Sequence, residues 1–263
     1  MTSEEDFGQY LDSYIGDDQH IALLLDYDGT LAEVPDRPEL SVIPPETKET
    51  LRRIANSGKV FVAIISGRSL DDLREKVGID GIVYSGNLGL EIQLPDGTKL
   101  NQTISEEATA NFHKMIEQLT KEVAYNGAWI QNKQIAFTLH YREMEPNLVP
   151  DLLVNAKRII ESYGYRTFAS HNALEANPPI EWNKGRAAEL ILSSSFDKNW
   201  KSRKVIFAGD DTPDEDVMKA IKGFGKSFRI TNGADVLTNA DFQIRSVQSV
   251  LKMLKWIENK MCK

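Results

Sequence analysis

Three short, continuously apolar runs limit what this chain can fold into: residues 21–25 (IALLL), 60–65 (VFVAII) and 205–208 (VIFA). Apolar runs of this length, bounded by turn residues, are typical of strands that are buried on both faces of a parallel sheet. A segment with helical periodicity follows each of the first two runs, and Ser69 is placed to cap the second of these helices. The alternation of strands and helices predicts an α/β fold with a doubly wound parallel sheet.

The alternation stops near residue 97 and resumes near residue 182. A Pro-Asp-Gly turn at 95–97 is typical of a hairpin between strands at 90–94 and 98–100. After this turn, the sequence shows patterns of both helices and strands, which suit a small α+β module with an antiparallel sheet. The expected helices lie at 112–123 and 152–163, and the expected strands at 128–131, 134–141, 165–169 and 173–176. We therefore expect one α/β core domain made of residues 1–97 and 182–263, with residues 98–181 inserted as a second domain.

Charge and composition exclude several classes of partner. The chain carries 31 Lys and Arg against 39 Asp and Glu, a formal net charge of −8. This balance argues against nucleic-acid and anionic-membrane partners, but it allows a small anionic substrate held by local cations. The apolar runs are far shorter than the ~20 residues that cross a bilayer, and the acidic first residues resemble neither a secretory signal nor a transit peptide. We expect a cytoplasmic protein, monomeric or weakly dimeric.

The cysteine and histidine content argues against two kinds of metal site. The single cysteine, Cys262, cannot form an intramolecular disulfide or a zinc site of several thiolates. The four histidines are scattered, with no pair at ligand spacing, so an imidazole site is not expected.

Two carboxylates, Asp26 and Asp28, follow the first apolar run. Ligands of open α/β sheets bind at the carboxyl ends of the strands, and residues two apart in an extended segment point to the same side. Two carboxylates in one site repel each other, so a cation or a shared proton is required. The alternative is a solvated turn at the end of a strand.

The third apolar run also ends in acids, at positions 210, 211, 214, 215 and 216. Repulsion among these acids lowers the stability of the folded protein unless they bind a hard divalent cation, which prefers oxygen ligands. Asp214 and Glu215 have another explanation, because acids are favourable at a helix N-terminus. Asp210 and Asp211 lie nearer the end of the strand, where that explanation is weaker.

Ser66 and Lys184 are candidate ligands for an anion. Ser66, Gly67 and Arg68 follow the second apolar run, where the Ser66 hydroxyl could donate to an anion. The alternative is a simple helix-capping segment. Lys184 begins a helix whose start borders the same crevice, where it could balance acids and an incoming phosphate, although a lysine there is usually a surface residue.

Taken together and in this order, these motifs resemble the haloacid-dehalogenase phosphatase superfamily, and within it the trehalose-6-phosphate phosphatases. The resemblance rests on residues 24–31 (LLDYDGTL), 62–68 (VAIISGR), 84–92 (YSGNLGLEI), 140–142 (HYR), 182–185 (WNKG) and 209–216 (GDDTPDED). It implies a Rossmann-like core with a small C2-type cap inserted after the third core strand, which is the layout predicted above.

The resemblance implies roles for the core residues. Asp26 would be the nucleophile that forms an aspartyl-phosphate, and Asp28 would protonate the leaving sugar oxygen and then deprotonate water. Mg²⁺ would be held by Asp26, the backbone carbonyl of Asp28 and Asp210, with Asp211 or Asp214 helping. Asp26, bound to the metal, would stay anionic, and crowding by carboxylates would let Asp28 keep a proton near neutral pH.

The resemblance implies that phosphate oxygens are bound by Ser66, Gly67, Arg68 and Lys184.

The resemblance also implies residues that bind the substrate sugar, and here the chain departs from the family pattern. The expected substrate-binding residues are Asn87, Lys133, His140, Arg142 and Glu175. The departures are Gln131 in place of a usual glutamate, Asn172 and Asn177 where Lys and Arg are more usual, and Pro213 in place of a threonine. We expect the hydrolytic residues to be intact and the sugar-binding residues to be altered.

The leading hypothesis is a Mg²⁺-dependent phosphatase that acts on trehalose 6-phosphate. Two alternatives stay open. One is a phosphatase or phosphomutase that acts on another sugar phosphate. The other is a weakly catalytic regulatory protein that binds sugar phosphates.

Overall fold

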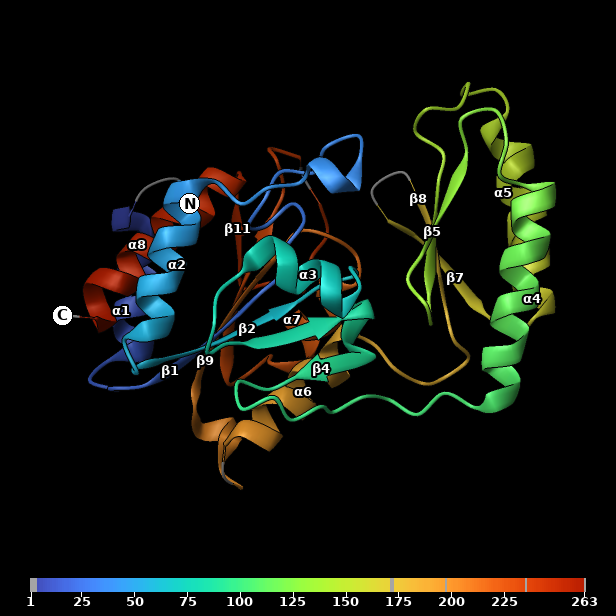
Figure 1. Ribbon diagram of the computed structural model, residues 1–263. Coiled ribbons are helices and arrows are strands. Elements are labelled where there is room, and N and C mark those ends of the chain that lie inside the picture. The colour runs from blue at the N-terminus through green and yellow to red at the C-terminus, as the bar shows by residue number, and fades with distance from the viewer. Residues whose placement is uncertain (1–3, 171–172, 197, 235, 263) are drawn as a thin grey trace. The chain divides into compact units, whose positions relative to one another are not determined.

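The computed structural model describes residues 4–170, 173–196, 198–234 and 236–262. The chain forms two compact units (Figure 1), one made of Met1–Asn101 with Trp182–Lys263 and the other of Gln102–Glu181. The first boundary lies four residues after the expected end of the core segment at 97, and the second boundary coincides with the expected one.

The first unit is built on a seven-stranded sheet with the order β11-β10-β9-β1-β2-β3-β4. All neighbouring strands are parallel except β3 and β4, which are antiparallel. This is the predicted α/β architecture. The strands are β1 (Ile21–Leu25), β2 (Val60–Ile65), β3 (Val83–Gly86), β4 (Glu91–Gln93), β9 (Lys204–Gly209), β10 (Gly225–Ile230) and β11 (Phe242–Ile244).

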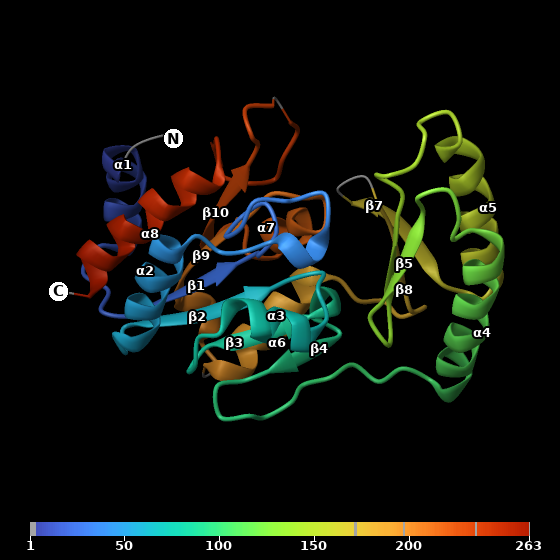
Figure 2. The ribbon, with the colours of Figure 1, turned by 45° about the horizontal axis from the view of Figure 1, so that its top comes forward.

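Helices cover both faces of this sheet (Figure 2), which explains why its central strands are apolar throughout. Along β1, Leu23 and Leu25 face one core, and Ala22 and Leu24 face the other. The first core includes helices α1 (Glu4–Ile15), α2 (Pro45–Asn56), α3 (Leu70–Val77) and α8 (Val247–Met261). The second includes α6 (Lys184–Ser195) and α7 (Asp214–Ala220).

Local signals in the sequence fix the ends of α3. The Ser69 side chain accepts a hydrogen bond from the backbone N–H of Asp72, as an N-cap residue does. The helix ends at Gly78, which has the left-handed φ of 55° that favours glycine.

Helix α1, strand β11 and the hairpin at 95–97 differ from what the sequence predicts. Helix α1 was not predicted, because its acidic composition masks Phe7, Leu11 and Ile15, which are buried at a spacing of four residues. Strand β11 was also missed. The hairpin at 95–97 is only partly formed: the turn is closed by hydrogen bonds, but its second arm is a single bridge between Gln93 and Lys99. Strand β4 instead pairs mainly with β3.

The second unit is a four-stranded antiparallel sheet with the order β5-β6-β8-β7, packed on two helices. Its elements are α4 (Glu106–Glu122), β5 (Trp129–Asn132), β6 (Phe137–His140), α5 (Val149–Ser162), β7 (Arg166–Ser170) and β8 (Ala173–Asn177). Phe137 and Leu139 of β6 join the apolar core with the helices, whereas Thr138 and His140 alternate with them and face the other side. Asn172 lies outside the described residues.

Among the residues that the structure describes, no helix is both long and apolar enough to cross a membrane.

Candidate active site

Three central strands of the first unit bring the predicted acids and Ser66 to one edge of the sheet. Strands β1, β2 and β9 are parallel, and Leu25 pairs with Ile64 on one side and Ala208 on the other. The residues that follow these strands, including Asp26, Ser66 and Asp210, therefore emerge at the same carboxyl edge.

Four charged side chains, which we call the acid–lysine cluster, meet at this edge: Asp26, Lys184, Asp210 and Asp214. Lys184 Nζ donates to Asp26 Oδ1 at 2.6 Å and to Asp214 Oδ1 at 2.8 Å. Carboxylate oxygens of the three aspartates lie within 4.8 Å of one another. Asp26, Asp214 and Lys184 are buried. The sequence separation between Lys184 and Asp26 is 158 residues, so the fold alone creates this contact.

The cluster holds more negative charge than its ammonium group neutralises. Burial raises the pKa of the Asp26 carboxyl well above its ordinary value; Lys184 opposes this shift, and Asp214 and Asp210 add to it. Burial lowers the pKa of Lys184, but Asp214 and Asp26 raise it by more, so Lys184 stays protonated. Three carboxylates around one ammonium leave excess negative charge, and hard oxygen donors of this kind suit a divalent cation such as Mg²⁺.

Two glycines allow the acids to approach the backbone closely. Gly29 has a φ of +79°, and a Cβ placed on it would lie 2.0 Å from Asp210 Oδ2. A Cβ on Gly209 would lie 2.4 Å from Asp214 Cγ. Real atoms cannot approach this closely, so both positions require glycine. This is a physical reason for glycine beside each acidic motif.

Asp214 also organises the acidic loop. Its Oδ2 accepts hydrogen bonds from the backbone N–H groups of Asp210 and Asp211, each at 3.0 Å. Pro213 occupies the N-cap position of α7 with a φ of −61°, which the proline ring favours, so this departure from the family pattern fits the local backbone. The Asp211 side chain accepts from the backbone N–H of Thr212 and is half-buried.

Glu215 serves the structure rather than the cluster. Its carboxylate accepts hydrogen bonds from Thr238 and from the backbone and side chain of Asn239, at 2.6–2.7 Å. Arg229 lies 3.5 Å from it and donates to the backbone carbonyl of Asp211. Glu215 therefore ties the acidic loop to the segment before β11.

Asp28 has partners different from those expected. Its carboxylate accepts two hydrogen bonds of 2.7 Å from Nε and Nη2 of Arg68, and one of 3.0 Å from the Ser41 hydroxyl. We expected other carboxylates to lie close to Asp28, but they lie close to Asp26 instead. The Arg68 guanidinium, expected to bind phosphate, is buried and also donates to Asp72 and to the backbone carbonyl of Pro38.

Ser66 and Asn87 are both buried, and each forms a hydrogen bond with the backbone of Arg68. The Ser66 hydroxyl oxygen accepts from the backbone N–H of Arg68 at 3.2 Å, across Gly67. The Asn87 amide, expected to bind substrate, donates to Glu91 Oε2 at 2.7 Å. Asn87 therefore has a structural partner at the start of β4.

The predicted sugar-binding residues of the second unit form a polar group on the sheet. Lys133 Nζ lies 3.1 Å from Glu175 Oε2, and Thr138 donates to Glu175 Oε1 at 3.0 Å. His140 Nε2 lies 3.0 Å from Gln131 Oε1. Arg142 is half-buried in the turn after β6, and Asn177 is half-buried at the end of β8.

Sequence reasoning missed several members of these groups. The ring of Trp129 stacks on His140 with centroids 4.1 Å apart. Strand alternation could have found Trp129, which lies two residues from Gln131 on the same face, and Thr138, which lies two from His140. Ser41 lies in an irregular loop, and no sequence pattern points to it.

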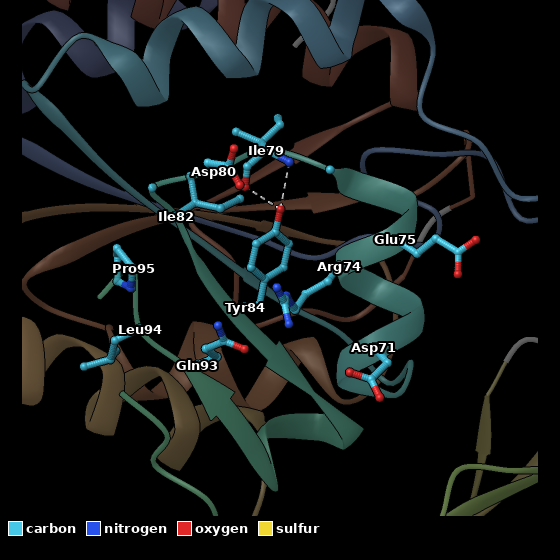
Figure 3. A pocket seen from close by; sticks show the side chains of 12 residues that line it. Asp71, Arg74, Glu75, Ile79, Asp80, Ile82, Tyr84, Gln93, Leu94 and Pro95 are labelled. Carbon is cyan, nitrogen blue, oxygen red and sulfur yellow. Dashed lines mark hydrogen bonds between the residues drawn. The ribbon is translucent and has the colours of Figure 1, made fainter. Parts of the chain in front are cut away.

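One pocket of the first unit lies away from the acid–lysine cluster. It has a volume of about 380 Å³ and is lined by the end of α3 and by strands β3 and β4 (Figure 3). Tyr84 projects into it, and the Tyr84 hydroxyl both donates to the carbonyl of Ile79 and accepts from its N–H. None of the acids of the cluster lines this pocket, so it is not the candidate active site.

The chain is similar to one family model and to several known proteins. The trehalose-phosphatase family model matches residues 24–248. Trehalose-phosphate phosphatase B of Arabidopsis thaliana is 28% identical over 248 residues, which cover 90% of this chain and 66% of that protein. An uncharacterized glycosyl hydrolase of Mycobacterium tuberculosis is 31% identical over 240 residues, which cover 89% of this chain and 18% of that protein. The chain thus spans less than two thirds of these relatives.

The fold also matches solved structures. The C-terminal domain of the trehalose-6-phosphate phosphatase of C. albicans superposes with a TM-score of 0.79 at 19% identity, and the match covers 98% of both chains.

Proposed function

The chain belongs to the trehalose-phosphatase family, and on that premise we propose that it releases inorganic phosphate from trehalose 6-phosphate with the help of Mg²⁺. The observation that carries the proposal is the acid–lysine cluster at the carboxyl edge of the sheet, with Lys184 bonded to Asp26 at 2.6 Å. Phosphoryl transfer depends mostly on positioning and on neutralising charge, and this cluster supplies groups for both.

Asp26 is the nucleophile of the proposed reaction. A carboxylate oxygen of Asp26 forms a bond to phosphorus, the bond from phosphorus to the sugar oxygen breaks, and Asp28 gives that oxygen a proton. Water then attacks the aspartyl-phosphate and gives a proton to Asp28, and the bond between phosphorus and Asp26 breaks. The sum of both steps is hydrolysis of a phosphate monoester to an alcohol and phosphate.

The cluster fits a divalent cation. Its three aspartates, with oxygens within 4.8 Å, would hold Mg²⁺, with the backbone carbonyl of Asp28 and the Asp211 side chain as further candidate ligands. When bound, the ion neutralises charge on the phosphoryl oxygens.

Other residues of the core bind phosphate or orient the acid. The Ser66 hydroxyl and the Lys184 ammonium bind the non-bridging phosphate oxygens. Arg68 orients Asp28 through its two hydrogen bonds of 2.7 Å, and Ser41 supports the same carboxylate.

In this proposal, the polar residues on the sheet of the second unit bind the sugar of the substrate. Lys133, Glu175, His140 and Arg142 supply donors and acceptors for hydroxyl groups. We expect Glu175→Gln to lower kcat/KM for trehalose 6-phosphate more than for a small aryl phosphate, which has no sugar to recognise. Equal losses on both substrates would contradict this role.

One observation favours a second candidate substrate. Gln131, where the family usually has a glutamate, forms a pair with His140, so an amide stands at this position in place of a second carboxylate beside Glu175. A phosphatase or phosphomutase for another sugar phosphate is therefore the alternative.

The test is phosphate release by the purified protein from a panel of sugar phosphates, with Mg²⁺ and with a chelator. We expect release that is highest with trehalose 6-phosphate and lost in Asp26→Asn. Release that persists in Asp26→Asn, or no release from any substrate, would contradict the proposal. An isomerised sugar phosphate without free phosphate would favour a mutase.

A further inference from the structure

A short left-handed turn follows β3 in the first unit. Asn87, Leu88 and Gly89 have φ values of 49°, 57° and 91°. Left-handed backbone is uncommon outside glycine, and a branched apolar residue such as leucine is a true outlier there. Among the described residues, the other non-glycine residues with positive φ are Asn126, Gln134 and Asn232, whose side chains carry amides. Leu88 is therefore the unusual member of this group.

The turn is fastened to the loop that contains Ser66. The backbone N–H of Asn87 donates to the carbonyl of Arg68 at 2.6 Å, and the N–H of Leu88 donates to the carbonyl of Ser66 at 2.9 Å. The N–H of Ser66 in turn donates to the carbonyl of Ser85 at 2.9 Å. Both ends of the Ser66–Arg68 segment are thus held by consecutive N–H groups of the left-handed turn.

The other side of the turn contacts the first turns of α6. A Cβ on Gly89 would lie 2.1 Å from Ala187 Cβ, so the backbone of the turn approaches the helix as closely as glycine allows. Ala187 lies three residues after Lys184, about one helical turn along α6. The turn therefore lies against both elements that carry the proposed phosphate ligands, Ser66 and Lys184.

We infer that this turn sets the spacing between Ser66 and Lys184, with Leu88 as a positioning residue. Strained backbone persists where the surrounding structure over-determines it, and such positions cluster at functional sites. A relaxed turn would not present two consecutive N–H groups to the Ser66 loop while keeping the close approach at Gly89. Leu88 is 7% exposed, and its Cδ2 would lie 3.5 Å from a Cβ placed on Gly67, so its side chain packs against the Ser66–Arg68 segment. The inference rests on the proposed function, which supplies the roles of Ser66 and Lys184.

Leu88→Gly tests the inference, because glycine lets the turn adopt other conformations. We expect kcat/KM to fall by roughly 10- to 100-fold, the size of effect that small misplacement of binding groups produces. The increase in melting temperature on adding inorganic phosphate, measured with Mg²⁺ present, should be lost, while the increase caused by Mg²⁺ alone should remain. Asn126→Gly is the matched control: it changes an exposed left-handed residue in the second unit and should leave both increases at wild-type values.

A second variant tests the contact with α6. Gly89→Ala places a Cβ against Ala187 and should weaken the response to phosphate, and adding Ala187→Gly should restore part of it. If Leu88→Gly and Gly89→Ala both retain the wild-type response to phosphate, the inference is overturned. If wild-type protein hydrolyses no sugar phosphate but its response to phosphate disappears in Leu88→Gly, the proposed function fails and the inference stands.

Discussion

Replacing Lys184 by methionine tests the charge balance of the acid–lysine cluster. The side chain is 4% exposed, and its ion-pair partners Asp26 and Asp214 are 6% and 0% exposed. Removing one partner of a buried ion pair leaves an uncompensated charge, at a cost of about 3–5 kcal/mol in the free energy of unfolding. For a domain of this size, each kcal/mol shifts the melting temperature by roughly 2–4 °C, so we expect a fall of about 6–20 °C.

The matched control is Lys260→Met in the same unit. Lys260 lies 2.9 Å from Asp12, almost the same separation as the 2.8 Å between Lys184 and Asp214, but these side chains are 34% and 57% exposed. Exposed pairs contribute about 0–1 kcal/mol, so this variant should melt within a few degrees of wild type.

The assay is thermal unfolding of both variants with a chelator and again with Mg²⁺. In Lys184→Met, Mg²⁺ should raise the melting temperature more than it does in wild type, because the ion supplies the positive charge that the lysine no longer provides. A loss below about 1 kcal/mol with the chelator, or a loss equal to that of Lys260→Met, would refute the reasoning from burial.

Three further predictions concern neighbouring residues. In Gly29→Ala, the new Cβ would lie 2.0 Å from Asp210 Oδ2 and would displace this carboxylate. We expect the affinity for Mg²⁺, measured by calorimetric titration, to fall by at least about tenfold. An unchanged affinity would contradict the proposed metal site. Arg68→Lys should lower turnover of a sugar phosphate more than that of p-nitrophenyl phosphate, whose leaving group needs little help from the acid Asp28; equal losses would favour direct phosphate binding by Arg68. Burial raises the pKa of Tyr27 to about 12 from the ordinary 10.0. Because the folded state holds this proton more tightly, its contribution to stability is complete below pH 10 and is lost between about pH 10 and 12, by roughly 2.7 kcal/mol. Tyr27→Phe should flatten this part of the stability profile, and an unchanged profile would count against the shift.

The sequence predicts the central sheet well, because its strands are buried on both faces. The continuous apolar runs at 21–25, 60–65 and 205–208 form β1, β2 and β9, each within a residue of the expected range. The gathering of acids and Ser66 at one edge follows from the parallel direction of these strands, since residues after parallel strands share that edge.

Side-chain partners could not be predicted in the same way. The bond from Arg68 to Asp28 spans 40 residues, and the bond from Ser41 to Asp28 depends on an irregular loop between β1 and α2. No periodicity describes such a loop. Helix α1 shows a second kind of failure: its apolar positions are few, and their role becomes clear only when they pack against the core with α8.

The order in which the ribosome makes the chain has a consequence for the insertion described above. Strand β1 lies between β2 and β9, but the whole of residues 102–181 separates β2 from β9 in the chain. The inserted unit is continuous and can fold as soon as it is synthesised, whereas the sheet around it must wait for β9. Asp26 and Lys184 are 158 residues apart in the sequence, so their contact can form only late in synthesis. A nascent chain therefore contains Asp26 long before the acid–lysine cluster can assemble.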